Sequence, residues 1–136
     1  MYPVITKHFS ELSVREYHRI VQAREAVFFL EQHITEPDAD AADPQSVFMW
    51  MEVIPAGIAY DEASVGRVLV DVSYRRRGLC RSLMSEALRY IARTWGPQPI
   101  RISAQEHLAG FYATFGFAPV SGTYFEAGIP HVKMLR

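Results

Sequence analysis

Four arginines and a glycine lie close together in the middle of the chain, at Arg75, Arg76, Arg77, Gly78 and Arg81. Guanidinium groups donate several charge-assisted hydrogen bonds and match the oxygen atoms of a phosphate. A glycine lets the backbone approach such an anion closely, because it has no side chain. The cluster therefore predicts a site for a phosphate group, although a solvated basic turn has the same composition.

The basic cluster joins two segments whose hydrophobic periods differ. Residues 65–72 are rich in valine and predict a buried strand, whereas from Leu79 the apolar residues recur every three or four positions, as on one face of a helix. The first amides of a helix have no intrahelical acceptors, and the helix dipole favours an anion there. Strand, basic turn and helix start together indicate an anion site at a helix N-terminus.

The spacing Arg75-x-x-Gly78-x-Cys80 resembles the pyrophosphate-binding signature of the GCN5-related N-acetyltransferases, in which Gly or Ala stands where this chain has Cys80. Residues 111–117, Phe-Tyr-Ala-Thr-Phe-Gly-Phe, look like the family's second landmark, a tyrosine four residues before Gly-Phe. Further short motifs are similar to the ElaA-type branch of the family and occur in the same order, at 24–32, 66–68, 104–108 and 128–131. The resemblance covers nearly the whole chain.

The resemblance implies an α/β fold with a mixed, mostly antiparallel sheet and helices on both faces. Its central pair of parallel strands splays apart to admit the pantetheine arm of the cofactor. The residues also predict the parallel pair directly, because a strand at 65–72, a helix from Leu79 and a strand at 99–104 form a βαβ unit.

The remaining elements follow from caps and hydrophobic periods. A capping box at Ser13 predicts a helix to about residue 30, with Arg24 on its apolar face. Residues 35–46 are acidic, contain prolines and predict an exposed loop. The other predicted elements are strands at 47–54, 57–60, 117–120 and 132–135, and a short helix at 106–115.

The composition predicts one globular domain over residues 1–136, since 49% of the residues are hydrophobic and 21% are charged. No apolar stretch predicts a signal peptide or a membrane span, so we expect a cytoplasmic protein. The single cysteine excludes an intrachain disulfide and a cysteine-rich metal site, and the five histidines show no metal-ligand spacing. We therefore expect no bound metal. For the oligomeric state we expect a monomer or a homodimer.

Charge is unevenly distributed, although the net charge is only −1. Residues 67–101 contain eight arginines against two carboxylates, and residues 31–66 contain eight carboxylates with no lysine or arginine. A pI near 6.5 with one compact basic patch does not provide the cationic surface that nucleic acids require. The acidic segment either favours a cationic acceptor or is only solvated surface.

The resemblance implies an N-acetyltransferase that uses acetyl-CoA as cosubstrate and acetylates a primary amine, on a small molecule or a peptide, by direct transfer in a ternary complex. Tyr112 matches the tyrosine that protonates the leaving thiolate, and Gln105 stands where the family often has an asparagine that binds the pantetheine arm. A backbone amide near Val70 matches the group that stabilises the oxyanion. The residues expected to bind the cofactor are Leu69, Val70, Asp71, Val72, Arg75, Arg76, Arg77, Gly78, Leu79, Cys80, Arg81, Gln105, Phe111 and Tyr112.

Three points stay open at this level. The first candidate for the general base is Glu31, because it begins the acidic segment. The alternatives are Glu126, His107, His131 and water. Arg24 either pairs inside the fold or reaches the acceptor pocket. A non-catalytic CoA-binding or regulatory module is the alternative function. A nucleotide-binding protein is a third, although the chain lacks Gly-x-x-x-x-Gly-Lys-Ser/Thr.

Overall fold

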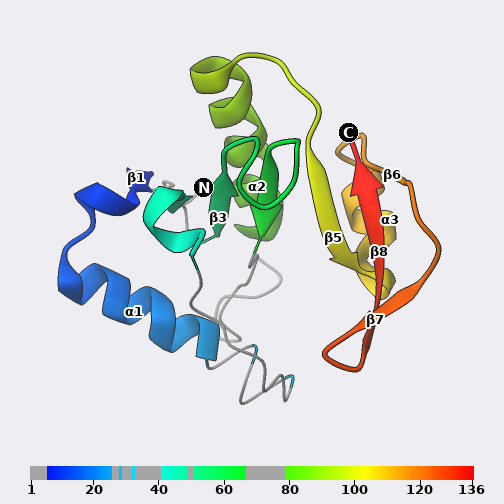
Figure 1. The fold of residues 1–136 in the computed structure, drawn as a ribbon, viewed down its shortest axis with the longest axis horizontal. Helices are drawn as coiled ribbons and strands as arrows, with labels where there is room; N and C mark the ends of the chain where they lie inside the picture. Colours follow the sequence, from blue (N-terminus) through cyan, green and yellow to red (C-terminus); the bar gives the residue numbers. More distant parts are fainter. Residues whose placement is uncertain (1–5, 26–27, 29–31, 33–40, 49–50, 67–78) are drawn as a thin grey trace.

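The computed structural model describes residues 6–25, 28, 32, 41–48, 51–66 and 79–136, and the rest of the chain is the thin grey trace in Figure 1. The described elements, in chain order, are β1 (Lys7–His8), η1 (Phe9–Glu11), α1 (Val14–Arg24), η3 (Asp43–Gln45), β2 (Val47–Phe48), β3 (Glu52–Ile54), β4 (Ser64–Gly66), α2 (Leu79–Tyr90), η5 (Ile91–Trp95), β5 (Arg101–Gln105), η6 (Glu106–Leu108), α3 (Ala109–Ala113), β6 (Ala118–Pro119), β7 (Tyr124–Glu126) and β8 (Ile129–Leu135).

The strands form two four-stranded groups that meet between β4 and β5. β1 to β4 are antiparallel neighbours in chain order, whereas β5, β6 and β7 all pair antiparallel with β8. β4 and β5 are joined by a parallel bridge between Ala63 and Ile100 and by the N–H of Arg101, which donates to Ala63 O at 2.9 Å. Within the described residues, no backbone hydrogen bond joins the two strands beyond that point. This arrangement confirms the expected mixed sheet with a splayed parallel pair.

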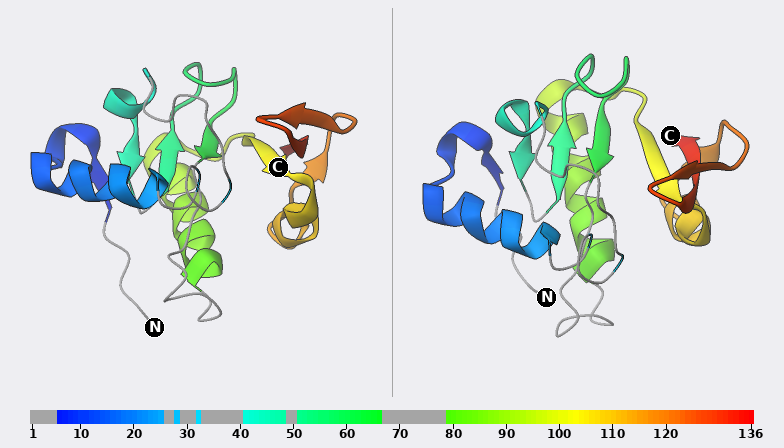
Figure 2. Two further views of the ribbon diagram at one scale, coloured as in Figure 1. Left: turned by 90° about the horizontal axis from the view of Figure 1, so that it is seen from below. Right: turned by 60° about the horizontal axis from the view of Figure 1, so that its bottom comes forward.

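Helices α1 and α2 lie on opposite faces of the first group of strands (Figure 2). Val53 of β3 is buried in the core with residues of α2, whereas its neighbour Glu52 pairs with Arg24 at the end of α1. Successive residues of a strand point to opposite faces, so the two helices must cover different faces. Helix α3 packs on the face of the second group of strands that points to the core, where Tyr112 is buried with Ala104 and Val132.

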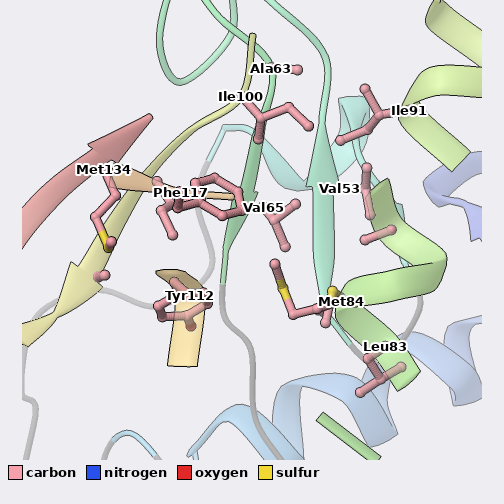
Figure 3. Packing of buried hydrophobic residues seen from close by; sticks show 14 of the residues in the cluster. Val53, Ala63, Val65, Leu83, Met84, Ile91, Ile100, Tyr112, Phe117 and Met134 are labelled. Atoms are coloured by element: carbon pink, nitrogen blue, oxygen red, sulfur yellow. The ribbon is translucent and has the colours of Figure 1, made fainter. Parts of the chain in front are cut away.

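The hydrophobic core lies where α2, α3 and the inner faces of both groups of strands meet (Figure 3). Met84 of α2 and Ile91 of η5 point toward Val53 and Val65, and Met134 of β8 lies close to Tyr112 and Phe117. The fully buried members include Met84, Ile91, Ile100, Met134 and Val53. One core therefore fixes the position of α2 and α3 relative to the strands on both sides of the splay.

The helix boundaries follow from local signals in the chain. The N–H of Glu16 donates to Ser13 Oγ at 3.0 Å and the N–H of Ser13 donates to Glu16 Oε1 at 2.9 Å, which confirms the capping box at the start of α1. After α1, Glu25 keeps a helical backbone (φ −63°, ψ −42°), and residues 26–27 and 29–30 of the predicted helix lie outside the described residues. The sequence Thr94-Trp95-Gly96-Pro97 predicts the end of the helix that begins at Leu79, and in the structure Gly96 has φ 85° and ends the helical segment after Trp95.

Two strand predictions are wrong. Residues 47–54 form two short antiparallel strands, with Val47 opposite Val53 and Phe48 opposite Glu52, and not one strand. Residues 57–60 form a turn, in which Gly57 has φ 83° and its N–H donates to Tyr60 O at 2.8 Å. Apolar residues in these ranges are buried by tertiary packing, so their composition alone does not show where the chain reverses.

The sequence analysis also missed β7. A two-residue turn joins β7 to β8, with φ 51° at Ala127 and φ 75° at Gly128, and it places Glu126 opposite Ile129. Such turns usually carry Asn-Gly or Asp-Gly, because both central residues need positive φ. Alanine in the first position hides the signal.

Candidate functional site

The start of α2 and the helix α3 form one side of the candidate site. The guanidinium carbon of Arg81 lies 5.5 Å from the ring centroid of Phe111 and 5.2 Å from that of Phe115. Its Nη1 donates to Thr114 Oγ1 at 3.4 Å. Within the described residues no carboxylate pairs with Arg81. The two rings and Thr114 fix the position of its guanidinium group, and most of its N–H donors stay available for solvent or a ligand.

Tyr112 is buried directly behind this surface, with 8% of the residue exposed. Its ring packs edge-to-face against Phe111 and Phe117, at centroid distances of 5.3 and 6.2 Å. Burial, with a smaller contribution from nearby Cys80, raises the pKa of Tyr112 to about 12. In the described part of the chain its hydroxyl has no hydrogen-bond partner. Tyr112 is thus a protonated phenol at neutral pH.

Cys80 shares these surroundings. Burial raises the pKa of its thiol, and the charge of Arg81 offsets this only partly. The thiol therefore stays protonated at neutral pH. A group with this pKa is a weak nucleophile, so a small side chain that fits beside the helix start is the simplest role for Cys80.

Gln105 ends β5 on the other side of the candidate site. Its Nε2 donates to Gln32 Oε1 at 3.1 Å, and in the strand register it lies opposite His131 of β8. Its neighbour Ala104 is buried in the same core as Tyr112. Because strand residues alternate between faces, Gln105 faces away from Tyr112 at the same end of the sheet.

A polar face covers that outer side of β5, β7 and β8. Ser103 Oγ donates to Glu126 Oε2 at 3.2 Å and is hydrogen-bonded to the Tyr124 hydroxyl. Glu126 Oε2 also lies 3.4 Å from His131 Nε2. Lys133 donates to the Tyr60 hydroxyl at 2.9 Å and lies over the Tyr60 and Tyr124 rings. We name Ser103, Tyr124, Glu126, His131 and Lys133 the polar face.

A second cluster, the buried ionic cluster, joins the end of α1 to η3 and β3. Arg24 Nη1 and Nη2 donate to the carboxylate of Asp43 at 3.3 and 3.4 Å, and Nη1 lies 4.0 Å from Glu52 Oε1. The Tyr17 hydroxyl donates to Asp43. The side chains of Arg24, Asp43 and Glu52 are only 3, 2 and 1% exposed. Arg24 therefore pairs inside the fold, which is one of the two alternatives that the sequence left open.

The surroundings of Asp43 keep its carboxylate charged. Burial disfavours the charged form of Asp43, but hydrogen bonds from Glu52 and Tyr17 and the charge of Arg24 outweigh it and hold the pKa of Asp43 below its usual value. Asp43 is therefore negatively charged beside the Arg24 guanidinium at neutral pH.

These contacts correct the expected acidic segment. Asp43 is buried and does not lie in an exposed loop, and Glu52 is buried with it. Glu62 forms a two-point ion pair with Arg101, with both N···O distances at 3.0 Å. Three of the eight carboxylates in 31–66 therefore serve the fold and contribute little to a field at an acceptor site. On the basic side, Arg89 and Arg93 are likewise paired, both with Glu86.

Of the expected site residues, the structure places Cys80, Arg81, Phe111 and Tyr112 together, with the helix backbone at Leu79, and it places Gln105 at the end of β5. The other expected residues lie outside the described residues, namely Glu31, Leu69, Val70, Asp71, Val72, Arg75, Arg76, Arg77 and Gly78. Their roles stay predictions. His107, an alternative base, is exposed on η6.

Sequence reasoning missed Asp43, Glu52, Ser103, Tyr124 and Lys133, because their partners are distant in the chain. Side chains of a strand alternate between its two faces, and this alternation along 101–105 and 129–135 is the signal that could have placed the polar strand residues on one face. Within the described ranges, no group of His, Cys, Asp or Glu is arranged to hold a metal ion. No helix in the described part of the chain is long and apolar enough to cross a membrane.

Residues 5–136 match the family model of an acetyltransferase (GNAT) domain, so the chain belongs to the GNAT family. It is 33% identical to the protein ElaA of Escherichia coli over 141 residues, which cover 95% of this chain and 92% of ElaA. The crystal structure of that ElaA superposes with a TM-score of 0.90 at 32% identity, over 100% of this chain and 99% of ElaA.

A second solved structure, an acyl-CoA N-acyltransferase from Pseudomonas aeruginosa, superposes with a TM-score of 0.91 at 29% identity, over 98% of each chain. These likenesses confirm the predicted family and fold. They also support the coarse chemistry, which is transfer of an acyl group from a CoA thioester to nitrogen.

Proposed function

We propose that the protein is an acetyl-CoA-dependent N-acetyltransferase that acetylates a primary amine, on a small molecule or a peptide, by direct transfer in a ternary complex. The family supports acyl transfer from a CoA thioester. The observation that carries the proposal is Tyr112, a buried phenol beside the start of α2 whose hydroxyl has no partner in the described part of the chain. Such a donor fits a thiolate leaving group.

In this proposal the segment before α2 holds the cofactor. Arg75, Arg76, Arg77 and Gly78 bind the pyrophosphate, and the backbone at 69–72 lines the pantetheine arm. Arg81 supports this role, because it lies in the first turn of α2 and no described carboxylate pairs with it. Gln105 completes the arm's hydrogen bonds from β5, and the N–H near Val70 stabilises the oxyanion of the tetrahedral intermediate.

Protonation of the thiolate by Tyr112 is uphill in water, where a phenol is a weaker acid than a thiol. Burial raises the pKa of Tyr112 and also that of the Cys80 thiol, so these surroundings favour the neutral, protonated form of both kinds of group. A CoA thiolate in this place becomes a stronger base for the same reason. Donation during C–S cleavage therefore becomes feasible when the two groups are held together.

Substitution Tyr112→Phe tests the proposal. It keeps the ring packing and removes only the hydroxyl, so acetyl-CoA affinity should persist while kcat falls by roughly 10²- to 10⁴-fold, the range for a lost general acid. Turnover is measured as release of free CoA with a panel of amines. Tyr90→Phe is the matched control, since Tyr90 packs edge-to-face on Trp95 at 5.5 Å, away from the candidate site. Full activity of Tyr112→Phe would remove this residue from the mechanism.

The alternative functions give different results in the same experiment. A non-catalytic module binds acetyl-CoA in calorimetry but releases no CoA with any amine. A nucleotide-binding protein binds ATP in preference to acetyl-CoA. The family assignment and the Tyr112 hydroxyl, which has no partner among the described residues, favour the enzyme over both.

A further inference from the structure

We propose that Glu126 and His131 form the pair that binds the ammonium group of the acceptor and removes its proton. The inference rests on the acetyl transfer proposed above and supplies its missing base. Attack on a thioester requires a neutral amine, whereas most primary amines are ammonium ions at neutral pH. The site therefore needs a group that attracts a cation and a group that accepts a proton.

Glu126 is suited to attract the cation. Its carboxylate accepts a hydrogen bond from Ser103 Oγ at 3.2 Å and lies 3.4 Å from His131 Nε2. Half of the side chain is exposed, and among the described residues no lysine or arginine pairs with it. An ammonium group that arrives from solvent can therefore pair with this carboxylate without displacing another cation.

A chain of donors orients the carboxylate. A carboxylate only accepts hydrogen bonds, so Ser103 uses its proton on Glu126 and accepts the proton of the Tyr124 hydroxyl. At the far end, the ammonium of Lys133 lies 5.0 Å from the centroid of the Tyr124 ring. Glu126 is thus held in place by hydrogen bonds that leave its outer side open.

His131 is suited to accept the proton. Its Nδ1 lies 2.7 Å from the carbonyl oxygen of Ile129, which can only accept, so Nδ1 carries the proton of the neutral ring. Nε2, the nitrogen beside Glu126, is then the free acceptor. The Tyr124 ring stacks on the imidazole at 6.0 Å with 27° between the planes, and the side chain is 9% exposed. Tautomer and orientation are therefore both set.

The pair lies across the sheet from the proton donor. Val132, next to His131, is buried in the core with Tyr112, so His131 points to the opposite face. Gln105, which we expect to bind the pantetheine arm, lies opposite His131 in the strand register. In acyl transfer the amine arrives and the thiolate leaves on different sides of the acyl carbon. A base on one face and an acid on the other match that requirement.

An ammonium nitrogen near Glu126 Oε2 can also reach His131 Nε2, because the two atoms are 3.4 Å apart. One N–H bond of the ammonium breaks and the proton binds Nε2, which leaves the electron pair on the nitrogen. That pair forms the C–N bond, the C–S bond breaks, and the thiolate takes the proton of Tyr112. The second proton of the attacking nitrogen passes through water to the phenolate, and the imidazolium releases its proton to solvent.

The test is steady-state kinetics against pH, with acetyl-CoA and an amine panel. His131→Gln should lower kcat by roughly 10²- to 10³-fold, keep the Kd for acetyl-CoA and lose the acidic limb of the wild-type profile of kcat/KM. Its rate should recover in part at high pH, where free amine no longer requires a base. A structural role alone would not change the profile. The ionisable groups of the described elements that face His131 are Glu126, Tyr124 and Lys133, so their conservative variants are compared.

Glu126→Gln should raise the KM for cationic amines by on the order of tenfold, the effect of one charge-assisted hydrogen bond. His18→Gln is the matched control, because His18 is an exposed histidine on α1. Its pH profile should equal that of the wild type.

Each outcome decides a different statement. If the wild type releases CoA with an amine but His131→Gln keeps its kcat and pH profile, the pair is not the base and the proposed function stands. If His131→Gln does not fold, Glu126→Gln decides, and unchanged KM and kcat in that half-exposed variant overturn the inference. If the wild type releases no CoA with any amine although it binds acetyl-CoA, the proposed function fails, and the pair's role fails with it.

Discussion

Each half of the molecule contains a cluster in which carboxylates meet a basic side chain, and the two clusters differ in burial. The buried ionic cluster joins Arg24, Asp43 and Glu52, and each of these side chains is at most 3% exposed to solvent. On the polar face, Glu126 is half-exposed beside His131. The residue types are similar, so exposure decides which cluster can exchange a partner for a ligand and which one holds elements of the fold together.

The energetic reason is the cost of leaving a charge without a partner. Removing one member of a buried pair leaves a desolvated charge and costs about 3–5 kcal/mol, whereas exposed pairs contribute about 0–1 kcal/mol. A buried cluster therefore cannot open during a catalytic cycle, but an exposed carboxylate can. The following changes test this contrast.

Arg24→Leu should produce the largest effect. It leaves Asp43 buried without its cation, so we expect the free energy of unfolding to fall by about 3–5 kcal/mol. Glu126→Gln is the comparison on the polar face and should change it by less than about 0.5 kcal/mol. Urea unfolding monitored by circular dichroism measures both. Equal destabilisation of the two variants would contradict the assignment of one cluster to the fold and the other to the ligand.

Acid should destabilise the fold through the buried ionic cluster. The pKa of Asp43 is lowered in the folded state, so its contribution to the free energy of unfolding is complete above the ordinary aspartate pKa and is lost as the pH falls through the lowered value. We expect a steep loss of stability below about pH 4, which Asp43→Asn flattens and Glu126→Gln does not. Glu16, whose pKa the hydrogen bond from Lys7 lowers to about 2, adds an exposed contribution that high salt screens.

A small stabilising effect should come from the turn that positions the polar face. Ala127 has φ 51°, a left-handed conformation that costs alanine about 1 kcal/mol and asparagine less. Ala127→Asn should therefore raise the free energy of unfolding by about 0.5–1 kcal/mol and leave KM and kcat unchanged, because Glu126 and His131 keep their register. A loss of stability, measured by thermal unfolding, would show that another contact holds Ala127 in place.

Much of the fold and part of the candidate site could be predicted from the sequence. The apolar face of α2 and the spacing from Phe111 to Phe117 depend on neighbours three or four positions apart, so they are visible before folding. Short strands such as β2, β3 and β7 were not predicted correctly, because two or three residues carry too little periodicity. The positions of 47–54 and 57–60 depend on the strands that pack against them.

The sequence by itself determined the features that depend on near neighbours in the chain. These are the capping box at Ser13, the helix stop at Gly96 and the family motif around Tyr112. Only the tertiary structure decided which ionisable groups meet, because Arg24 and Asp43, like Ser103 and Glu126, are about twenty residues apart and contact each other only after packing. Packing also decided their exposure. The same carboxyl group is therefore part of the fold at Asp43 and open to a ligand at Glu126.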